Sequence, residues 1–220
     1  MTGKRREGGK MSFTRPEDIE AESFRIIAEE MKEKGISIPG DEAPVTMRVI
    51  HTTADFDYSA TLAFSKGAAE KLSRLLKQGT RIVTDTNMAK SGINKGLLSG
   101  YGGEVLCFMA EKNVASEAAE RGITRAMVSM ERAASLTGDT VYVIGNAPTA
   151  LMLLKEKIEE DGYRPAFIVG VPVGFVNVVK SKEEIRKTAE TYGIPYIINM
   201  GRKGGSNVAA AIINAALKML

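Results

Sequence analysis

The sequence predicts an α/β protein: a three-layer α/β/α sandwich with a mainly parallel central sheet, flavodoxin-like in its arrangement. Short runs rich in β-branched residues alternate along the chain with longer segments of helical periodicity. The short runs are apolar throughout, which is typical of strands covered by helices on both faces. No Pro/Ser-rich linker, low-complexity tract or internal repeat interrupts the 220 residues. We therefore expect a single domain from residue 13 to the C-terminus.

The first elements are a basic segment and an amphipathic helix. Residues 1–12 are rich in Gly, Lys and Arg, which is typical of a disordered, solvated tail; a phosphate-binding arm is the alternative. A helix is predicted from Pro16, since proline suits a first helical turn, to Gly35, which suits a helix end. Its apolar residues recur at roughly helical spacing: Ile19, Phe24, Ile27 and Met31.

Strands and helices then alternate. The predicted strands are "VTMRVIH" (45–51), "RIVTD" (81–85), "EVLCFM" (104–109), "TVYVIGN" (140–146), "AFIVG" (166–170) and "PYIINMG" (195–201). The predicted helices between and after them span 67–78, 124–136, 148–160, 182–192 and 206–219. Cys107 lies in the third run, so we expect it as a small apolar filler of a buried strand.

The composition argues against several classes of protein. The net charge is +3, but the first ten residues carry four basic side chains and one acidic one, so the other 210 have no net charge to attract nucleic acid. One cysteine excludes a disulfide framework and fits a reducing cytoplasm. One cysteine and one histidine are too few for an ordinary zinc site. No long apolar run or signal-peptide core is present, so we expect no membrane insertion or export.

Polar and glycine-rich segments follow the predicted strands. In open parallel sheets, ligands bind beyond the carboxyl ends of the strands, where loops and helix N-termini converge. The segments there are 51–53 (HTT), 85–87 (DTN), 145–149 (GNAPT), 170–174 (GVPVG) and 201–206 (GRKGGS). Thr86, Asn146 and Thr149 are therefore candidate ligand contacts on one rim, although Thr149 also suits a helix cap and the GNAPT segment alone also fits a purely structural turn.

The segment "GRKGGS" precedes an Ala-rich helix and is typical of an anion-binding site. Its glycines let the backbone N–H groups of Gly205 and Ser206 approach an anion at a helix N-terminus, while Arg202 and Lys203 supply positive charge. An ordinary glycine-rich turn is the alternative. The segment is not the phosphate loop G-x-x-x-x-G-K-[ST], and no G-x-G-x-x-G follows the first strand, so a nucleotide is not indicated.

His51 is the only histidine and is expected at the carboxyl end of the first strand, beside hydroxyls and carboxylates. A histidine side chain exchanges protons near neutral pH, which suits general acid–base catalysis. A hydrogen-bonded structural histidine is the alternative. A serine-type triad is not indicated, because Ser59 and Ser91 lie in no nucleophile elbow and Cys107 lies in the sheet.

Five segments, in this order and spacing, resemble the precorrin-8X methylmutases of corrin-ring (vitamin B12) biosynthesis. They are "RVIHTTADFDY", "TDTNMAKSGI", "GNAPTALMLL", "GVPVGFVNVVKSKE" and "GRKGGSNVAAAIINA". The resemblance implies a flavodoxin-like fold, a homodimer, and an isomerase that needs no added cofactor. The implied reaction moves a methyl group from C11 to C12 of ring C, giving hydrogenobyrinic acid in the cobalt-free route and cobyrinic acid in the cobalt-first route.

The resemblance also implies roles for individual residues. His51 matches the family's catalytic histidine, proposed as proton donor and acceptor at ring C. Ser23 and Arg48 match substrate-contacting positions, and Arg125 corresponds to the arginine of the family's Thr-Arg segment. On an ideal strand Arg48 and His51 lie on opposite faces, so both reach one ligand only if the chain twists or leaves the sheet before His51.

A polyanionic substrate suits the predicted rim. The tetrapyrrole carries acetate and propionate arms, and each charge-assisted hydrogen bond adds about 1.5–3 kcal/mol. Arg202, Lys203 and the amides of Gly205 and Ser206 fit this role. The alternatives are a non-catalytic tetrapyrrole carrier or product-sequestering protein, and a nucleotide-dependent flavodoxin-like enzyme, against which the missing phosphate fingerprint argues. The 11 methionines and the apolar C-terminal helix are compatible with a buried dimer contact.

Overall fold

The computed structural model describes residues 15–219. The tail predicted at residues 1–12 lies outside these residues. The chain divides into two compact units, Met1–Ser37 and Ile38–Leu220, and each is described by itself. The single domain expected over residues 13–220 stays a prediction.

The described part of the first unit, residues 15–37, contains one helix, α1 (Pro16–Glu33), as predicted. Pro16 occupies the first turn together with two acidic residues, Glu17 and Asp18, which suit the positive end of the helix dipole. On the exposed surface, Arg25 pairs with Glu22 at 2.6 Å and also with Glu29, one turn away on either side. Oppositely charged side chains three or four residues apart support a helix.

The second unit is built on a six-stranded sheet with the order β1-β6-β5-β4-β2-β3. The strands are β1 (Leu62–Phe64), β2 (Arg81–Thr84), β3 (Val105–Leu106), β4 (Thr140–Ile144), β5 (Phe167–Gly170) and β6 (Tyr196–Asn199). All neighbours pair in parallel except β1, which runs antiparallel to β6 at the edge. Without β1, the strand order is the flavodoxin-like order 2-1-3-4-5. The predicted fold class is confirmed.

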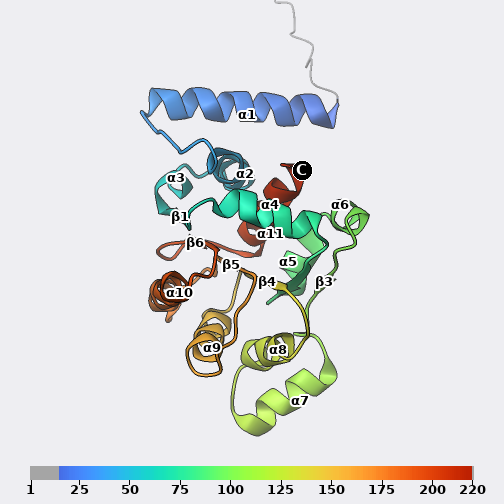
Figure 1. The fold of residues 1–220 in the computed structure, drawn as a ribbon. Coiled ribbons are helices and arrows are strands. Elements are labelled where there is room, and N and C mark those ends of the chain that lie inside the picture. The colour runs from blue at the N-terminus through green and yellow to red at the C-terminus, as the bar shows by residue number, and fades with distance from the viewer. Residues whose placement is uncertain (1–14, 220) are drawn as a thin grey trace, which may run out of the picture. The chain divides into compact units, whose positions relative to one another are not determined.

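Helices cover both faces of this sheet (Figure 1). One face carries α4 (Ala68–Lys77), α5 (Asn87–Gly92) and α11 (Ser206–Lys218), with α2 (Ala43–Thr53) packed on α11. The other carries α8 (Arg125–Ala134), α9 (Pro148–Glu159) and α10 (Val178–Tyr192). Shorter or peripheral helices are α3 (Tyr58–Thr61), α6 (Lys95–Gly100) and α7 (Lys112–Arg121). None of the helices in residues 15–219 combines the length and apolarity needed to span a bilayer.

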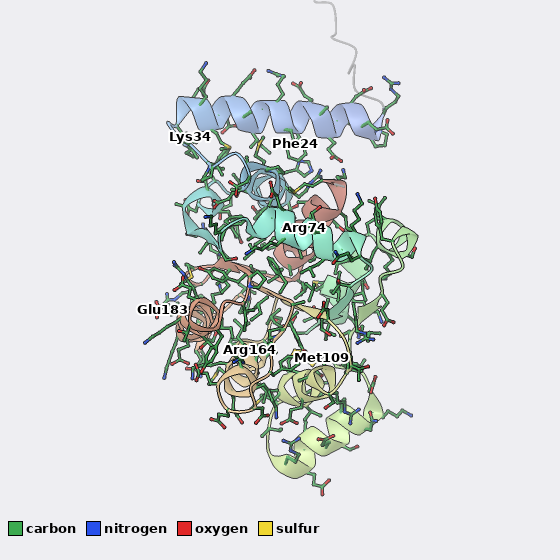
Figure 2. The ribbon with its side chains drawn as sticks, viewed as in Figure 1. Phe24, Lys34, Arg74, Met109, Arg164 and Glu183 are labelled. Atoms are coloured by element: carbon green, nitrogen blue, oxygen red, sulfur yellow. The ribbon has the colours of Figure 1, made fainter. Side chains whose placement is uncertain are left out.

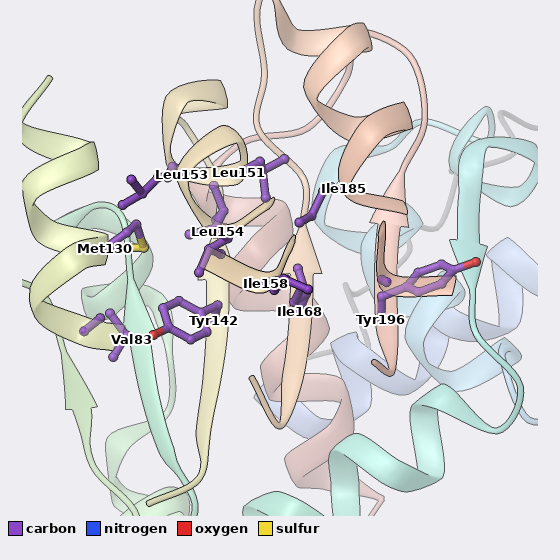
Figure 3. Close-up of a cluster of buried hydrophobic side chains, with 14 of the residues drawn as sticks. Val83, Met130, Tyr142, Leu151, Leu153, Leu154, Ile158, Ile168, Ile185 and Tyr196 are labelled. Atoms are coloured by element: carbon purple, nitrogen blue, oxygen red, sulfur yellow. The ribbon is translucent and has the colours of Figure 1, made fainter. Parts of the chain in front are cut away.

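The core beneath α8, α9 and α10 is formed by alternate residues of the central strands. Tyr142 and Ile168 point to this face, where they meet Leu151, Leu154 and other buried side chains (Figure 3). The Tyr142 hydroxyl shares a 2.9 Å hydrogen bond with that of Tyr163, which satisfies its buried polar atom. Side chains fill the layers between the sheet and the helices on both faces (Figure 2). This packing fixes the positions of the strand ends.

The first predicted strand, residues 45–51, is wrong: these residues belong to helix α2. Pro44 stands in its first turn, and the buried side chains are Val45, Thr46, Val49 and Ile50. That spacing of four is helical, and it places one apolar face against α11. His51 therefore lies in the last turn of a helix and not at a strand end.

One smaller expectation is also wrong. The run "EVLCFM" pairs as a strand only at Val105 and Leu106, and Cys107 lies just beyond it, partly exposed. Within α11, every residue except Asn207, Asn214 and Lys218 is buried in the single chain, and a dimer contact at this helix stays a prediction. The remaining predicted strands and helices are confirmed to within a few residues.

Candidate functional site

A groove of about 420 Å³ lies between α2, α11 and the α5–α6 segment of the second unit. Its lining is Arg48, His51, Thr52, Gly92, Asn94, Leu97, Asn207, Ala210, Ala211, Asn214 and Lys218. Three of the lining residues have basic side chains, three have side-chain amides, and none has a carboxylate. Such a groove suits an extended ligand with acidic groups.

Arg48 and His51 reach this groove together because α2 is a helix. Residues three apart lie on the same face of a helix, so the twist that a strand would have required is unnecessary. The helix ends sharply just after His51, where Ala54 adopts a left-handed conformation with φ 52°. The hydroxyls of Thr52 and Thr53 donate to the carbonyls of Arg48 and Val49, which stiffens this last turn.

One face of α11 forms the floor of the groove. A single stripe on this face is formed by Asn207, Ala210, Ala211, Asn214 and Lys218, whose successive spacings of three, one, three and four keep them on one side of the helix. The Asn214 amide accepts from the N–H of Asn94 at 2.8 Å and donates to the carbonyl of Gly92 at 2.8 Å. A Cβ at Gly92 would lie 2.8 Å from that of Ala210. The α5–α6 turn is thereby held close against the α11 floor.

The end of α2 is tied to the loop between β6 and α11. The Lys203 ammonium lies 2.5 Å from Asp55 and 2.7 Å from Asp57, which follow α2 directly. Hydrogen bonds to these two carboxylates raise the pKa of Lys203, and the same contact lowers the pKa of Asp55. Lys203 was predicted as a substrate cation; in the structure its charge is already balanced by two aspartates.

The carboxyl ends of β2 and β4 are joined by Asp85. Its buried carboxylate accepts hydrogen bonds from the backbone N–H groups of Gly145, Asn146 and Ala147 at 2.8, 2.8 and 2.6 Å. Burial raises the pKa of Asp85, and the three amide donors oppose that effect. Asp85 therefore fixes the loop from which the Asn146 side chain projects. Sequence analysis named the DTN segment but assigned this residue no role.

Thr86 and Ser206 meet where α5 and α11 begin. The two hydroxyl oxygens lie 2.8 Å apart, and the Thr86 hydroxyl also accepts from the N–H of Ala89 as the α5 cap. A Cβ at Gly145 would lie 2.8 Å from the Cα of Ser206. The ends of β2 and β4 and the start of α11 are thus in direct contact, as the rim hypothesis expected.

Arg125 and Thr149 lie at the starts of α8 and α9 on the same rim. The hydroxyl oxygens of Thr149 and Thr124, the residue that caps α8, are 3.0 Å apart. This contact holds the two helix N-termini together with Arg125 exposed beside them. Both helix dipoles and the guanidinium favour an anion at this point.

The "GRKGGS" segment differs from the predicted anion cradle in one respect. The N–H of Gly205 donates to the carbonyl of Val171 at 2.9 Å, so this amide serves the fold. The guanidinium of Arg202 lies over the Phe175 ring, 5.3 Å from its centroid, and both side chains are exposed. Arg202 therefore extends from the rim beside an apolar tip formed by Val173, Phe175 and Val176.

Ser23 lies on α1 in the first unit, so its position is described only within that unit. Within residues 15–219, no group of three or more His, Cys, Asp or Glu side chains is arranged to hold a metal ion. The second unit thus presents two neighbouring parts: a groove with Arg48 and His51, and a rim with the other predicted contacts.

Comparisons with known proteins identify the family. Residues 18–219 match the family model described as precorrin-8X methylmutase. The chain belongs to the precorrin-8X methylmutase family. It is 44% identical to the cobalt-precorrin-8 methylmutase of Leptospira interrogans, covering 91% of this chain and 92% of that protein, and 45% identical to that of Salmonella typhimurium, covering 92% and 94%. The precorrin-8X methylmutase of Pseudomonas aeruginosa is 39% identical, covering 90% and 92%.

A solved structure agrees with this assignment. The crystal structure of the precorrin-8X methylmutase from Thermus thermophilus has a TM-score of 0.80 and 37% sequence identity, covering 92% of this chain and 95% of that one. Methylmutases of this family are isomerases of cobalamin biosynthesis. The resemblance found from the five sequence segments is confirmed.

Part of the groove lining was not predicted from the sequence. Asn94, Asn207, Asn214 and Lys218 line the groove but were not among the predicted contacts. A signal was present for three of them, because polar residues at 207, 214 and 218 share one face of a helix that is otherwise apolar. Asn94 had no such signal, since only the fold brings the α5–α6 turn to α11.

Proposed function

We propose that this chain moves the methyl group from C11 to C12 of ring C in precorrin-8X or cobalt-precorrin-8, giving hydrogenobyrinic or cobyrinic acid. The observation that carries the proposal is the placement of His51. The only histidine of the chain lines a carboxylate-free groove on the same helical face as Arg48. The proposal is supported by relatives with both names, precorrin-8X and cobalt-precorrin-8 methylmutase.

In this proposal His51 acts as the proton donor and acceptor. The protonated imidazole donates a hydrogen bond to ring C or its nitrogen, which draws electron density from the ring and favours the sp³ carbon that the methyl group leaves. The methyl carbon's bond to C11 breaks as its bond to C12 forms; a proton that passes from His51 to the ring during the shift returns to His51 when the product has formed. Because the isomerisation has no net proton or redox change, one acid–base residue suffices and no added cofactor is required.

The remaining predicted contacts hold the macrocycle. Arg48 in the groove and Arg125 and Arg202 on the rim provide cations for the acetate and propionate arms, and Thr86, Asn146, Thr149 and Ser206 provide polar groups at helix N-termini. Lys203 and Ser23 are retained as proposed contacts, whereas Gly205 is not, because its N–H donates to the carbonyl of Val171. For Lys203 a role through its backbone is favoured, because its ammonium pairs with Asp55 and Asp57.

The test is turnover by His51→Ala. Loss of the acid–base group should lower the rate about 10²–10⁴-fold, while the affinity for hydrogenobyrinic acid, measured by absorbance titration, stays within a few-fold. Thr53→Ala is the matched control on the same helix, because the Thr53 hydroxyl bonds to a backbone carbonyl and is absent from the groove lining. Near-normal isomerisation by purified His51→Ala would contradict the mechanism.

We also propose that the enzyme is a cytoplasmic homodimer, as its family resemblance implies. Sedimentation equilibrium at micromolar concentration should give twice the 23.7 kDa chain mass. A non-catalytic carrier is the alternative function, and it would bind the product equally well. Several turnovers of substrate per active site would distinguish the enzyme from the carrier.

A further inference from the structure

Lys182 is a fully buried lysine that no step of the proposed mechanism uses. It lies in the first half of α10, and its side chain is 0% exposed. Lysine is almost never fully buried without a paired charge, yet within residues 15–219 Lys182 forms no ion pair with a carboxylate. Burying an ammonium without a carboxylate partner costs folding free energy. The burial of Lys182 therefore needs a physical reason.

The partners of Lys182 are two carbonyls of the β6–α11 loop. Its ammonium donates to the backbone oxygens of Gly201 and Lys203, each at 2.8 Å. The carbonyl of Lys203 also accepts from the buried Asn199 side chain at 2.8 Å. The intervening carbonyl, that of Arg202, accepts from the N–H of Gly174 at 3.2 Å. Three successive carbonyls of the loop therefore accept hydrogen bonds from other parts of the protein.

The hydrogen bonds to these carbonyls fix the directions of the loop amides. In a trans peptide the N–H points opposite to the preceding carbonyl, and the chain contains no cis peptide among its described bonds. The N–H of Arg202 thus points away from Lys182, and that of Lys203 points away from Gly174. Within residues 15–219 neither of these amides donates a hydrogen bond. In contrast, the N–H of Gly204 bonds to Tyr58 and the N–H of Gly205 donates to the carbonyl of Val171.

We propose that Lys182 is a positioning residue of the substrate site: its buried ammonium holds the loop so that the backbone N–H groups of Arg202 and Lys203 bind a carboxylate arm of the tetrapyrrole. The inference rests on the proposed function. It replaces Gly205 by Arg202 and Lys203 as the amide donors of the loop. The Lys203 ammonium meanwhile anchors the same loop to Asp55 and Asp57, four and six residues beyond His51.

A buried cation suits this task better than a neutral donor. It grips two carbonyls at once through charge-assisted hydrogen bonds, which are shorter and stronger than neutral ones. Its positive charge also lies directly beneath amides whose ligand is an anion, and a low-dielectric interior screens that charge little. Lys182 never touches the substrate, so it acts through the loop and not as a catalytic residue.

The direct test uses the wild-type protein. Isotope-labelled enzyme is titrated with hydrogenobyrinic acid, and the amide resonances of Arg202 and Lys203 are followed by NMR. Both should shift at saturation by more than those of Gly138 and Gly162, in turns away from the rim with open space beside their Cα atoms. Unchanged Arg202 and Lys203 amides at saturation would overturn the inference.

The second test compares Lys182→Met with Lys180→Met. Both variants remove one lysine from the first turns of α10. The Lys180 side chain, however, is 73% exposed, and its ammonium lies 3.7 Å from the nearest carboxylate oxygen of Glu184, a long ion-pair distance. Lys182→Met should weaken hydrogenobyrinic acid binding about tenfold or more, roughly the effect of one charge-assisted hydrogen bond. Lys180→Met should change it less than twofold. Equal affinities of the two variants would contradict the positioning role.

Turnover separates this inference from the proposed function. Amide shifts in a wild-type protein that binds the product but does not isomerise precorrin-8X would support the loop site and contradict the mutase assignment. Turnover without those shifts would do the reverse. If Lys182→Met fails to fold, the titration of the wild type still decides.

Discussion

Gly204 is the residue at which the β6–α11 loop comes closest to the end of β5. It has φ 155°, and a Cβ placed there would lie 2.1 Å from the carbonyl oxygen of Val171. Because that contact is with backbone, it cannot be relieved by turning a side chain. Gly204→Ala should therefore lower the free energy of unfolding by about 2 kcal/mol or more, measured by urea denaturation.

The control for this substitution is Gly122→Ala. Gly122 also has a positive φ, 64°, but a Cβ there meets nothing within 4 Å. Only the left-handed backbone is then penalised, by about 1 kcal/mol. Equal losses in the two variants would show that the close approach to Val171 adds nothing to the backbone strain.

Because of Lys182, the stability of the protein should rise with pH in the alkaline range. Burial lowers the pKa of Lys182 from 10.5 to about 8. Between these values the unfolded chain binds more protons than the folded one, so stability rises with pH. Relative to Lys182→Met, the wild type should gain about 2 kcal/mol between pH 7.5 and pH 10 in urea denaturation. A difference between the two proteins that stays constant over this range would contradict a buried, charged Lys182.

At the scale of the elements, α2 shows where local sequence patterns mislead. Residues 45–51 are rich in β-branched side chains, which favour strands in general, but the spacing of its buried residues is helical. The apolar face of α2 packs against α11, and tertiary packing outweighs the weak local preference. The error mattered for the site, since it placed Arg48 and His51 on opposite faces when they share one.

The other strands were predictable because they are buried on both faces. The strands β2, β4, β5 and β6 are mostly apolar and are buried at every position except Arg81, and their pairing places the following loops on one edge as expected. The edge strand β1 has only three half-exposed residues and gave no comparable signal. Contacts such as that of Asp85 with residues 145–147 join segments 60 residues apart, and no local pattern encodes them.

The C-terminal end of α2 is a point at which the element can be stabilised. Ala54 has φ 52° at the helix end, a position that glycine usually occupies. Ala54→Gly should raise the free energy of unfolding by about 0.5 kcal/mol, because relief of left-handed strain exceeds the entropy cost of glycine. Thermal and urea denaturation measure the change.

Ala115→Gly provides the opposite case. Ala115 is exposed in the middle of α7, where glycine costs about 1 kcal/mol relative to alanine. The two substitutions are chemically identical, so the sign of the effect depends only on the local backbone. A loss of stability in Ala54→Gly comparable to that in Ala115→Gly would show that Ala54 is not held in the left-handed conformation in solution.

For the molecule as a whole, charge is arranged locally and not as a general field. The residues after the tenth carry no net charge. Many of their charged side chains form surface ion pairs, such as those of Arg121 and Arg132 with Glu117. A polyanionic substrate therefore gains little from long-range attraction. In the proposed function, its recognition depends instead on a few cations at the rim and groove, above all Arg48, Arg125 and Arg202.

Salt dependence should reveal this local recognition. Arg125→Ala and Arg202→Ala should each weaken hydrogenobyrinic acid binding about fivefold at 50 mM NaCl, the effect of about 1 kcal/mol per exposed pair. At 500 mM the loss should shrink, because screening over a few ångströms already weakens the pairs in the wild type. Lys157→Ala is the control, since Lys157 pairs with Asp161 in the last turn of α9, about 12 Å along the helix from Thr149. Losses that are equal at both salt concentrations would mean that the arginines act through packing and not through charge.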